Sequence, residues 1–364
     1  MLLFCAAFLF DLKGMHGAEL VLSHLTKDRK TEQTGESRQG EISKLIVDYR
    51  LLADVIENKR RFYLDTFPSL EFVVLQGGDA WPDEIIALSV LLGHEPVNLD
   101  YEHPPDARED LMYVSLERIR LMLESNTPSA TLFLSDEPMG WREKLCVLTI
   151  NPVEIAANDQ TATHYLIEPY YEIRGKIKPQ NYLDRREFVE FVFDHEVYHC
   201  LESNFIGPQP MSFLEFWGEY HHYRHENGAD AFAVAMHMKR HGAVTDFVKN
   251  INLIRALTLF CDDCNHWTPE IITKVSNTEM KLLQTMDTAE IFRYATSLRN
   301  IIVPNYSDYL VYRSAAKEVC AQINSDLWNL GDEENLPEPD PKMVTDMLDT
   351  FRRSYFELTG NEID

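Results

Sequence analysis

The stretch 191-FVFDHEVYHCLE-202 decides how the rest of the chain is interpreted, because it holds two histidines four residues apart. Residues four apart on a helix lie one turn apart on the same face, so His195 and His199 can present two imidazole nitrogens to one metal ion. Glu196 lies about 100° further round the helix, where its carboxylate can take a proton from a metal-bound water. Two ligands and a general base on one helix are typical of a zinc site that activates water.

The residues before this motif predict that its helix is buried. Asp184, with Glu187 three residues later, has the spacing of a capping box at a helix start. The residues that follow are strongly apolar: Phe188, Val189, Phe191, Val192 and Phe193. Burying two histidines and a glutamate without partners would cost several kcal/mol, and a metal ion would satisfy them together. A structural hydrogen-bond cluster is the alternative that the sequence leaves open.

A second predicted helix, within 221-HHYRHENGADAFAVAMHMKRHG-242, offers a third ligand. Its pattern E-x-x-A-D-x-x-A places Glu226 and Asp230 one turn apart, and Gly242 after three basic residues is typical of a helix end. Glu226 can bind the metal, while Asp230 can accept the free N–H of a ligand histidine and fix its tautomer. Four rivals for the third ligand lie close by, and a solvated helix start is the alternative for the histidines among them: Asp230, His221, His222 and His225.

Over residues 188–233 the chain resembles the gluzincin branch of the zincin metallopeptidases. In that branch, HExxH on one helix is joined by a glutamate on a second helix and by an aspartate four residues later. The resemblance implies a Zn²⁺ cofactor and the following roles: His195, His199 and Glu226 as metal ligands, Glu196 as the catalytic general base, and Asp230 as the partner of a ligand histidine.

The sequence departs from related patterns at three positions. The metzincin spacing fails, because Glu202 and Phe205 stand where that pattern has glycine and histidine. Gly228, inside the second predicted helix, weakens the start of that helix.

A donor that stabilises the oxyanion is also needed, and five side chains are candidates: Tyr220, Tyr223, His237, His241 and His266.

The order of patterns along the chain predicts an α+β, zincin-like fold. Helices are expected at 41–64 and 104–123, short strands at 71–78, 131–136, 144–150 and 163–173, and helices from 184 to about 325. We expect a small mixed sheet packed on the active-site helix, followed by a mostly helical C-terminal half. The run THYLIEPYYEI at 163–173 is the candidate edge strand for aligning a peptide substrate.

Five segments are predicted from changes in composition. Residues 1–19 are an apolar N-terminal segment that matches the core of a secretory signal, with an ordinary apolar strand or helix as the alternative. A secretory signal would imply export, and an ordinary strand or helix would imply a cytoplasmic location. The remaining segments are a flexible polar connector at 20–43, a mainly helical region at 44–125, a catalytic domain at 126–330, and an acidic linker with a last helix at 331–364.

Acidic residues outnumber basic ones, 59 to 34, which gives the chain a net charge of -25. Such a field repels phosphate backbones, so nucleic acid is not expected as a partner. The first apolar run is too short to span a bilayer, and no integral membrane segment is expected. The sequence therefore predicts a zinc metallopeptidase acting on a protein or peptide. A zinc hydrolase of another bond and a non-catalytic binding protein are the alternatives.

Overall fold

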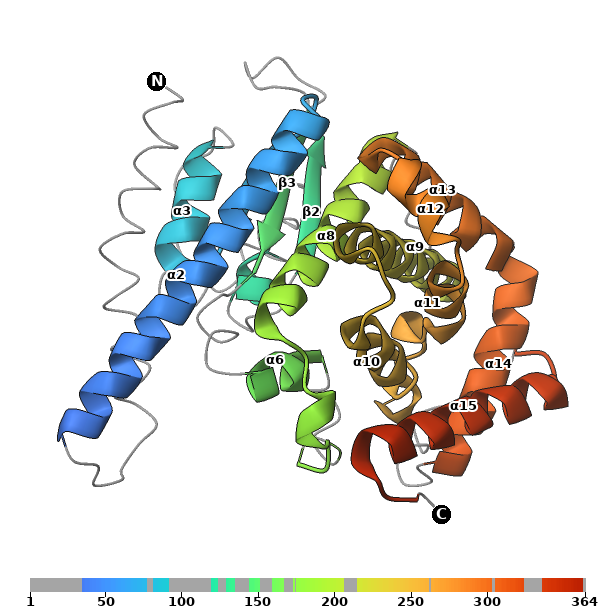
Figure 1. The fold of residues 1–364 in the computed structure, drawn as a ribbon. Helices are drawn as coiled ribbons and strands as arrows, with labels where there is room; N and C mark the ends of the chain where they lie inside the picture. Colours follow the sequence, from blue (N-terminus) through green and yellow to red (C-terminus); the bar gives the residue numbers. More distant parts are fainter. Residues whose placement is uncertain are drawn as a thin grey trace, which may run out of the picture. The chain divides into compact units, whose positions relative to one another are not determined.

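The protein is described by a computed structural model, which divides into two compact units, residues 1–158 and 159–364 (Figure 1). The predicted signal-like segment 1–19 lies outside the described residues, which are 35–76, 81–91, 119–123, 129–134, 144–150, 159–166, 173, 175–205, 215–261, 263–302, 305–323 and 336–362.

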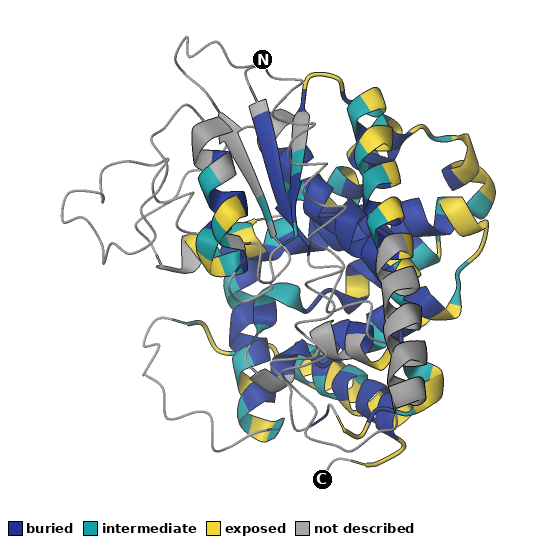
Figure 2. Cartoon of the chain, turned by 90° about the vertical axis from the view of Figure 1, so that its left-hand side faces the viewer, coloured by how far each residue is buried: buried dark blue, intermediate teal, exposed yellow. Residues whose placement is uncertain are grey.

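The first unit contains a three-stranded mixed sheet in the order β1-β3-β2. The central strand β3 runs parallel to β1, with Leu75 opposite Thr149, and antiparallel to β2, with Ser129 opposite Thr149. Its residues 145–149 are buried (Figure 2). The strand predictions at 71–78, 131–136 and 144–150 are confirmed by β1 (Glu71–Leu75), β2 (Ser129–Leu134) and β3 (Lys144–Thr149).

Two helices accompany this sheet, α2 (Gly35–Thr66) and α3 (Trp81–Leu91). One face of α2 is apolar and buried at Leu52, Val55 and Ile56. The helix begins at Gly35, within the segment that the sequence predicts as a flexible connector. One apolar cluster joins α3, residues 119–123 and the strands β1 and β3: Leu75, Ile85, Leu88, Ile119, Leu123, Leu145 and Val147.

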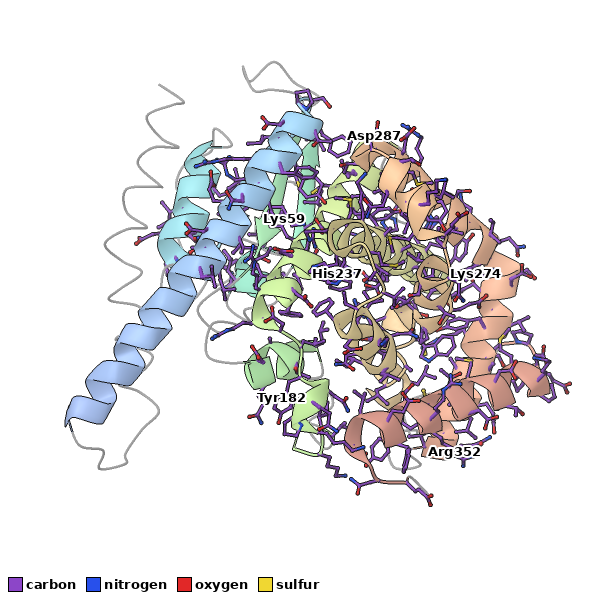
Figure 3. The ribbon with its side chains drawn as sticks, in the orientation of Figure 1. Lys59, Tyr182, His237, Lys274, Asp287 and Arg352 are labelled. Atoms are coloured by element: carbon purple, nitrogen blue, oxygen red, sulfur yellow. The ribbon has the colours of Figure 1, made fainter. Side chains whose placement is uncertain are left out.

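The second unit is a helical assembly in which α9 packs against α8, α11 and α13 (Figure 1). Side chains fill the spaces between these helices, as Figure 3 shows. The elements are α6 (Asp159–Leu166), η4 (Pro179–Asn181), α8 (Arg185–Phe205), α9 (Glu215–His241), α10 (Asp246–Arg255), η5 (Thr258–Cys261), η6 (Cys264–His266), α11 (Pro269–Ser276), α12 (Met280–Thr285), α13 (Thr288–Ile302), α14 (Tyr306–Ile323) and α15 (Pro341–Thr359).

Local sequence explains where the two central helices begin and end. The Glu187 N–H donates to Asp184 Oδ1 at 2.9 Å, which confirms the predicted cap of α8. Gly242 follows α9 with a φ of 68°, and its N–H donates to the Met238 carbonyl at 2.8 Å. A positive φ at this position favours glycine, so the predicted end of α9 is confirmed as well.

The prediction of an α+β, zincin-like fold is wrong. Helices account for 78% of the described residues, so the fold is mostly helical. All three described strands belong to the first unit, whereas α8 and α9, with the histidine motif, belong to the second. The described residues of 159–364 form no strand. The described residues of the unit that holds the active-site helix therefore supply none of the sheet that the sequence predicts.

The predicted edge strand at 163–173 is also wrong where the structure describes it, because residues 163–166 form the last turn of α6. Asp159 opens this short helix, and the Thr163 hydroxyl donates back to the Asp159 carbonyl at 2.8 Å. Tyrosine and threonine favour strands only when neighbouring strands are present to pair with. Among the helices that the structure describes, none combines the length and the apolar character needed to cross a membrane.

Candidate metal centre

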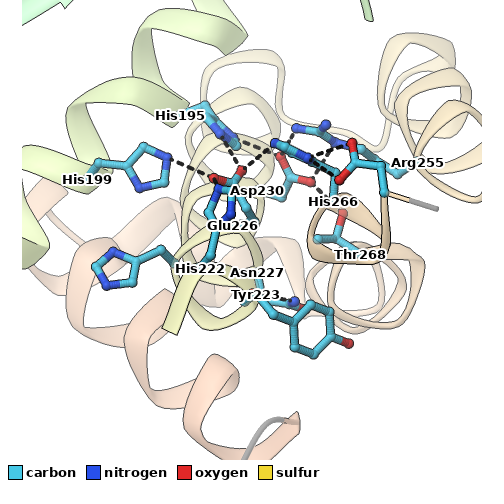
Figure 4. A network of polar contacts seen from close by, with 12 residues as sticks. His195, His199, His222, Tyr223, Glu226, Asn227, Asp230, Arg255, His266 and Thr268 are labelled. Atoms are coloured by element: carbon cyan, nitrogen blue, oxygen red, sulfur yellow. Dashed lines mark hydrogen bonds and ion pairs between the residues drawn. The ribbon is translucent and has the colours of Figure 1, made fainter. Parts of the chain in front are cut away.

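The HExxH histidines and the first acidic residue of the second motif converge in the structure (Figure 4). His195 Nε2 lies 3.1 Å from Glu226 Oε2, and His199 Nε2 lies 3.6 Å from Glu226 Oε1. The two imidazole rings are 5.1 Å apart between centroids and nearly perpendicular, at 81°. One ligand atom from each of the three side chains lies within 4.8 Å of the others.

The two nitrogen–oxygen distances, 3.1 Å and 3.6 Å, are close to the separations between ligand atoms in a tetrahedral zinc site. With metal–ligand bonds of about 2.0 Å, ligand atoms in a tetrahedron lie ~3.3 Å apart. Although Glu226 Oε2 is near two imidazole nitrogens, it is buried and receives no hydrogen bond of acceptable geometry. A buried carboxylate oxygen without a hydrogen bond is costly, and a cation would compensate it. The donor set of two imidazoles and one carboxylate therefore fits zinc.

Asp230 holds His195 in the orientation that a metal ligand needs. Its Oδ1 lies 2.8 Å from His195 Nδ1, and because an ionised carboxylate only accepts, the proton resides on Nδ1. The Nε2 atom is thereby the one presented to Glu226. Asp230 is fully buried, and it accepts further hydrogen bonds from Arg255 Nε at 2.8 Å, Arg255 Nη2 at 2.9 Å and Thr268 Oγ1 at 2.5 Å.

Arg255 balances the buried negative charge of Asp230. Burial alone would raise the pKa of Asp230, but Arg255 and His195 hold it well below its usual range. Arg255 lies at the end of α10, and Thr268 precedes α11, so two further helices fix the position of the carboxylate. The charge of Asp230 is thus used locally, and Glu226 carries the charge available to a cation.

Two more histidines face Glu226. His222, one turn earlier on α9, has its Nε2 3.2 Å from Glu226 Oε1. His266, in η6, has its Nε2 3.3 Å from Glu226 Oε2 and its Nδ1 2.8 Å from Asp263 Oδ2. Four Nε2 atoms from four rings therefore surround one carboxylate.

The protonation of the ligand histidines differs because their neighbours differ. Burial lowers the pKa of His199 to about 3, so this imidazole is neutral at physiological pH. Burial also acts on His195, but the carboxylates of Asp230 and Glu226 outweigh it and raise the pKa to about 9. A metal ion bound at His195 must therefore displace a proton near neutral pH.

Glu196 is 8% exposed and follows His195 on α8. Burial raises the pKa of its carboxyl group to about 7, and the nearby charge of Glu226 acts in the same direction. A group with a pKa near the working pH can both accept and return a proton, which a general base in hydrolysis must do. A bound dication would lower this pKa again.

Gly228 allows α8 and α9 to approach each other at the centre. A Cβ atom at this position would lie 2.2 Å from Tyr198 Oη and 2.4 Å from Tyr198 Cζ. Tyr198 is fully buried, and its hydroxyl lies 3.1 Å from Thr296 Oγ1 on α13. The glycine that the sequence marks as a weakness of the second helix is thus required by the packing beside the ligands.

The structure brings together four of the side chains that the sequence predicts for the site: His195, His199, Glu226 and Asp230. Glu196 follows His195 on α8, and its carboxyl group interacts electrostatically with His195 and Glu226. Of the rival histidines, His222 has its Nε2 atom next to Glu226. His225 instead pairs with Glu202, at 2.9 Å between Nδ1 and Oε2, and Glu202 also binds Arg299. His225 therefore does not fit the solvated helix start that is the alternative for these histidines.

Sequence reasoning missed Arg255, Thr268 and Asp263. Each comes from a separate element, and no spacing along the chain links them to the motif helices. His266 was a candidate only as an oxyanion donor, and it is the member of that group that contacts Glu226. The buried charge of Asp230 signals that a cation must lie nearby, but this signal does not identify which arginine supplies it.

The chain matches no protein family model, and neither a similar curated protein nor a similar solved structure was found. The geometry of this site is therefore the basis for assigning a function.

Proposed function

We propose that the protein is a zinc-dependent hydrolase of the gluzincin type that cleaves peptide bonds. The observation that carries the proposal is the convergence of one nitrogen each of His195 and His199 and one Glu226 oxygen, all within 4.8 Å of one another, with Glu196 next to His195 in the sequence of α8. Two imidazoles and one carboxylate leave a fourth position open in a tetrahedral site, as catalytic zinc requires.

The chain supplies the groups that such a reaction needs around the metal. When bound, zinc lowers the pKa of a coordinated water and polarises a substrate carbonyl. Glu196 accepts the proton of the attacking water and returns it to the leaving amine. Asp230 keeps His195 in the tautomer whose Nε2 faces the metal position, which strengthens this ligand.

The choice of a peptide substrate rests on the H-E-x-x-H and E-x-x-A-D patterns. The predicted edge strand at 163–173 no longer supports it, because residues 163–166 are helical. A zinc hydrolase of another carbonyl bond has the same ligands and the same base, so the experiment must separate these activities.

The test is a comparison of zinc-loaded wild type with Glu196→Gln on a mixture of unlabelled peptides, with cleavage read by mass spectrometry. We expect the variant to keep its zinc and to lose turnover by about 10²–10⁴-fold. Glu190→Gln is the matched control, because Glu190 lies on the same helix but pairs with Arg240 at 2.7 Å, away from the ligands.

Three results would contradict the proposal. Equal cleavage by wild type and Glu196→Gln would remove Glu196 as the base. Absence of peptide cleavage by wild type that holds zinc, together with hydrolysis of ester or amide substrates, would exclude the peptidase assignment. Absence of bound zinc after loading would remove the metal chemistry altogether.

A further inference from the structure

The Glu226 carboxylate is shared by two groups of potential metal ligands. The first is His195, His199 and Glu226, and the second is His222, Glu226 and His266, again with ligand atoms within 4.8 Å of one another. Each Glu226 oxygen faces one histidine of each pair. Oε1 lies near His199 and His222, and Oε2 lies near His195 and His266.

The second pair of rings is arranged like the first. The rings of His222 and His266 are 5.7 Å apart at an interplanar angle of 80°, compared with 5.1 Å and 81° for His195 and His199. Nearly perpendicular rings let both Nε2 atoms point at a common position. A third group, with Glu187, lacks this property, because the rings of its His237 and His241 are stacked 4.2 Å apart at 20°.

His266 also has the support that ligand histidines usually have. Its Nδ1 lies 2.9 Å and 2.8 Å from the two oxygens of Asp263, so the proton resides on Nδ1 and Nε2 faces Glu226. This repeats the pairing of His195 with Asp230. A carboxylate behind the imidazole fixes the ring and makes it a stronger ligand.

We propose that the protein binds a second divalent transition-metal cation at His222, His266 and Glu226, with the Glu226 carboxylate bridging the two ions. Imidazole and carboxylate donors suit zinc and its neighbours such as Co²⁺ and Ni²⁺, rather than cations that require oxygen ligands alone. Two ions that share a carboxylate lie roughly 3.5–4 Å apart in hydrolytic sites. The inference rests on the proposed function, because the first ion uses the same Glu226.

Exposure predicts that the second ion binds more weakly and exchanges faster. The side chains of His222 and His266 are 51% and 30% exposed, whereas those of His195 and His199 are 8% and 18% exposed. A half-exposed ligand is less firmly positioned and competes with water. A chelator should therefore remove the second ion first.

The test uses the full chain, stripped of metal and titrated with Co²⁺ or Zn²⁺, with bound metal counted by equilibrium dialysis and elemental mass spectrometry. We expect two ions per chain in wild type and one in His222→Gln or His266→Gln. His199→Gln should lose the tighter ion. The matched control is His221→Gln, which changes the neighbouring residue and should still bind two.

The outcomes separate this inference from the proposed function. One ion in wild type, kept in His222→Gln and lost in His199→Gln, overturns the second site and leaves the first intact. If wild type holds one ion and His266→Gln lowers turnover without losing it, His266 is a hydrogen-bond donor and the second site is again overturned. No ion in wild type overturns both. Because His222 is exposed, its variant tests the site even if His266→Gln fails to fold.

Discussion

Replacement of Gly228 by alanine tests the packing that brings the two ligand helices together. The new Cβ would lie 2.2–2.5 Å from three atoms of Tyr198, about 1 Å closer than ordinary contact. Tyr198 cannot simply move aside, because its ring packs against Phe232 and Phe292 and its hydroxyl against Thr296.

The net effect follows from two opposing contributions. Overpacking costs about 1–3 kcal/mol, and displacing the tyrosine hydroxyl costs about 1 kcal/mol more. Alanine in place of glycine in a helix returns at most about 1 kcal/mol. We therefore expect Gly228→Ala to lower the free energy of unfolding by about 1–3 kcal/mol, which corresponds to a Tm lower by roughly 3–10 °C.

Gly218 provides the matched control on the same helix. A Cβ there would meet nothing within 4 Å, so Gly218→Ala should leave stability unchanged or raise it by up to about 1 kcal/mol. Both variants are compared by circular dichroism during thermal and urea unfolding. In a Tyr198→Leu background, Gly228→Ala should no longer destabilise. If Gly228→Ala is as stable as Gly218→Ala in the wild-type background, the close contact between α8 and α9 is not as described.

Two further predictions concern the charges around the ligands. Arg255→Met leaves the buried carboxylate of Asp230 without its counter-charge, so this variant should lower the free energy of unfolding by about 3–5 kcal/mol. The double variant with Asp230→Asn should lose less than the sum of the losses of the two single variants. Additive losses in urea unfolding would contradict the pairing of Arg255 with Asp230. The carboxylates of Asp230 and Glu226 raise the pKa of His195 to about 9, so zinc must displace a proton from this imidazole when it binds. Zinc affinity should therefore rise about tenfold per pH unit between about pH 6.5 and 8.5 and level off above about pH 9. Calorimetry in two buffers of different ionisation enthalpy counts the proton, and an affinity independent of pH would refute this assignment.

The predictable part of the site is the part written in local spacing. His195 and His199, or Glu226 and Asp230, are one helical turn apart, so their shared faces follow from the sequence alone. His266 and Arg255 reach the same point from other elements, and only the packing of α10 and η6 against the rest of the unit brings them there. The charge of Asp230 requires a cation, yet the sequence alone does not show which of several arginines supplies it.

The fold was harder to predict than the site for a related reason. Three of the four expected strands exist, because short apolar runs bounded by turns identify strands well. Which helices a sheet covers depends on contacts between distant segments, which such patterns do not encode. Residues 163–166 show the same limit, because their strand propensity is overridden by the helix that begins at Asp159.

The segment that carries His266 contains a natural reporter of its own stability. Cys264, at the start of η6, is a buried thiol that forms no disulfide, and α14 contacts it: Tyr312 Oη donates to its carbonyl at 2.7 Å, and Arg313 Nη1 lies 3.0 Å from its Sγ. A thiol reagent can reach Cys264 only when this segment separates from α14. The labelling rate at Cys264, localised by peptide mapping, thus measures how often the wall of the metal centre opens, and a bound ion that stabilises His266 should slow it.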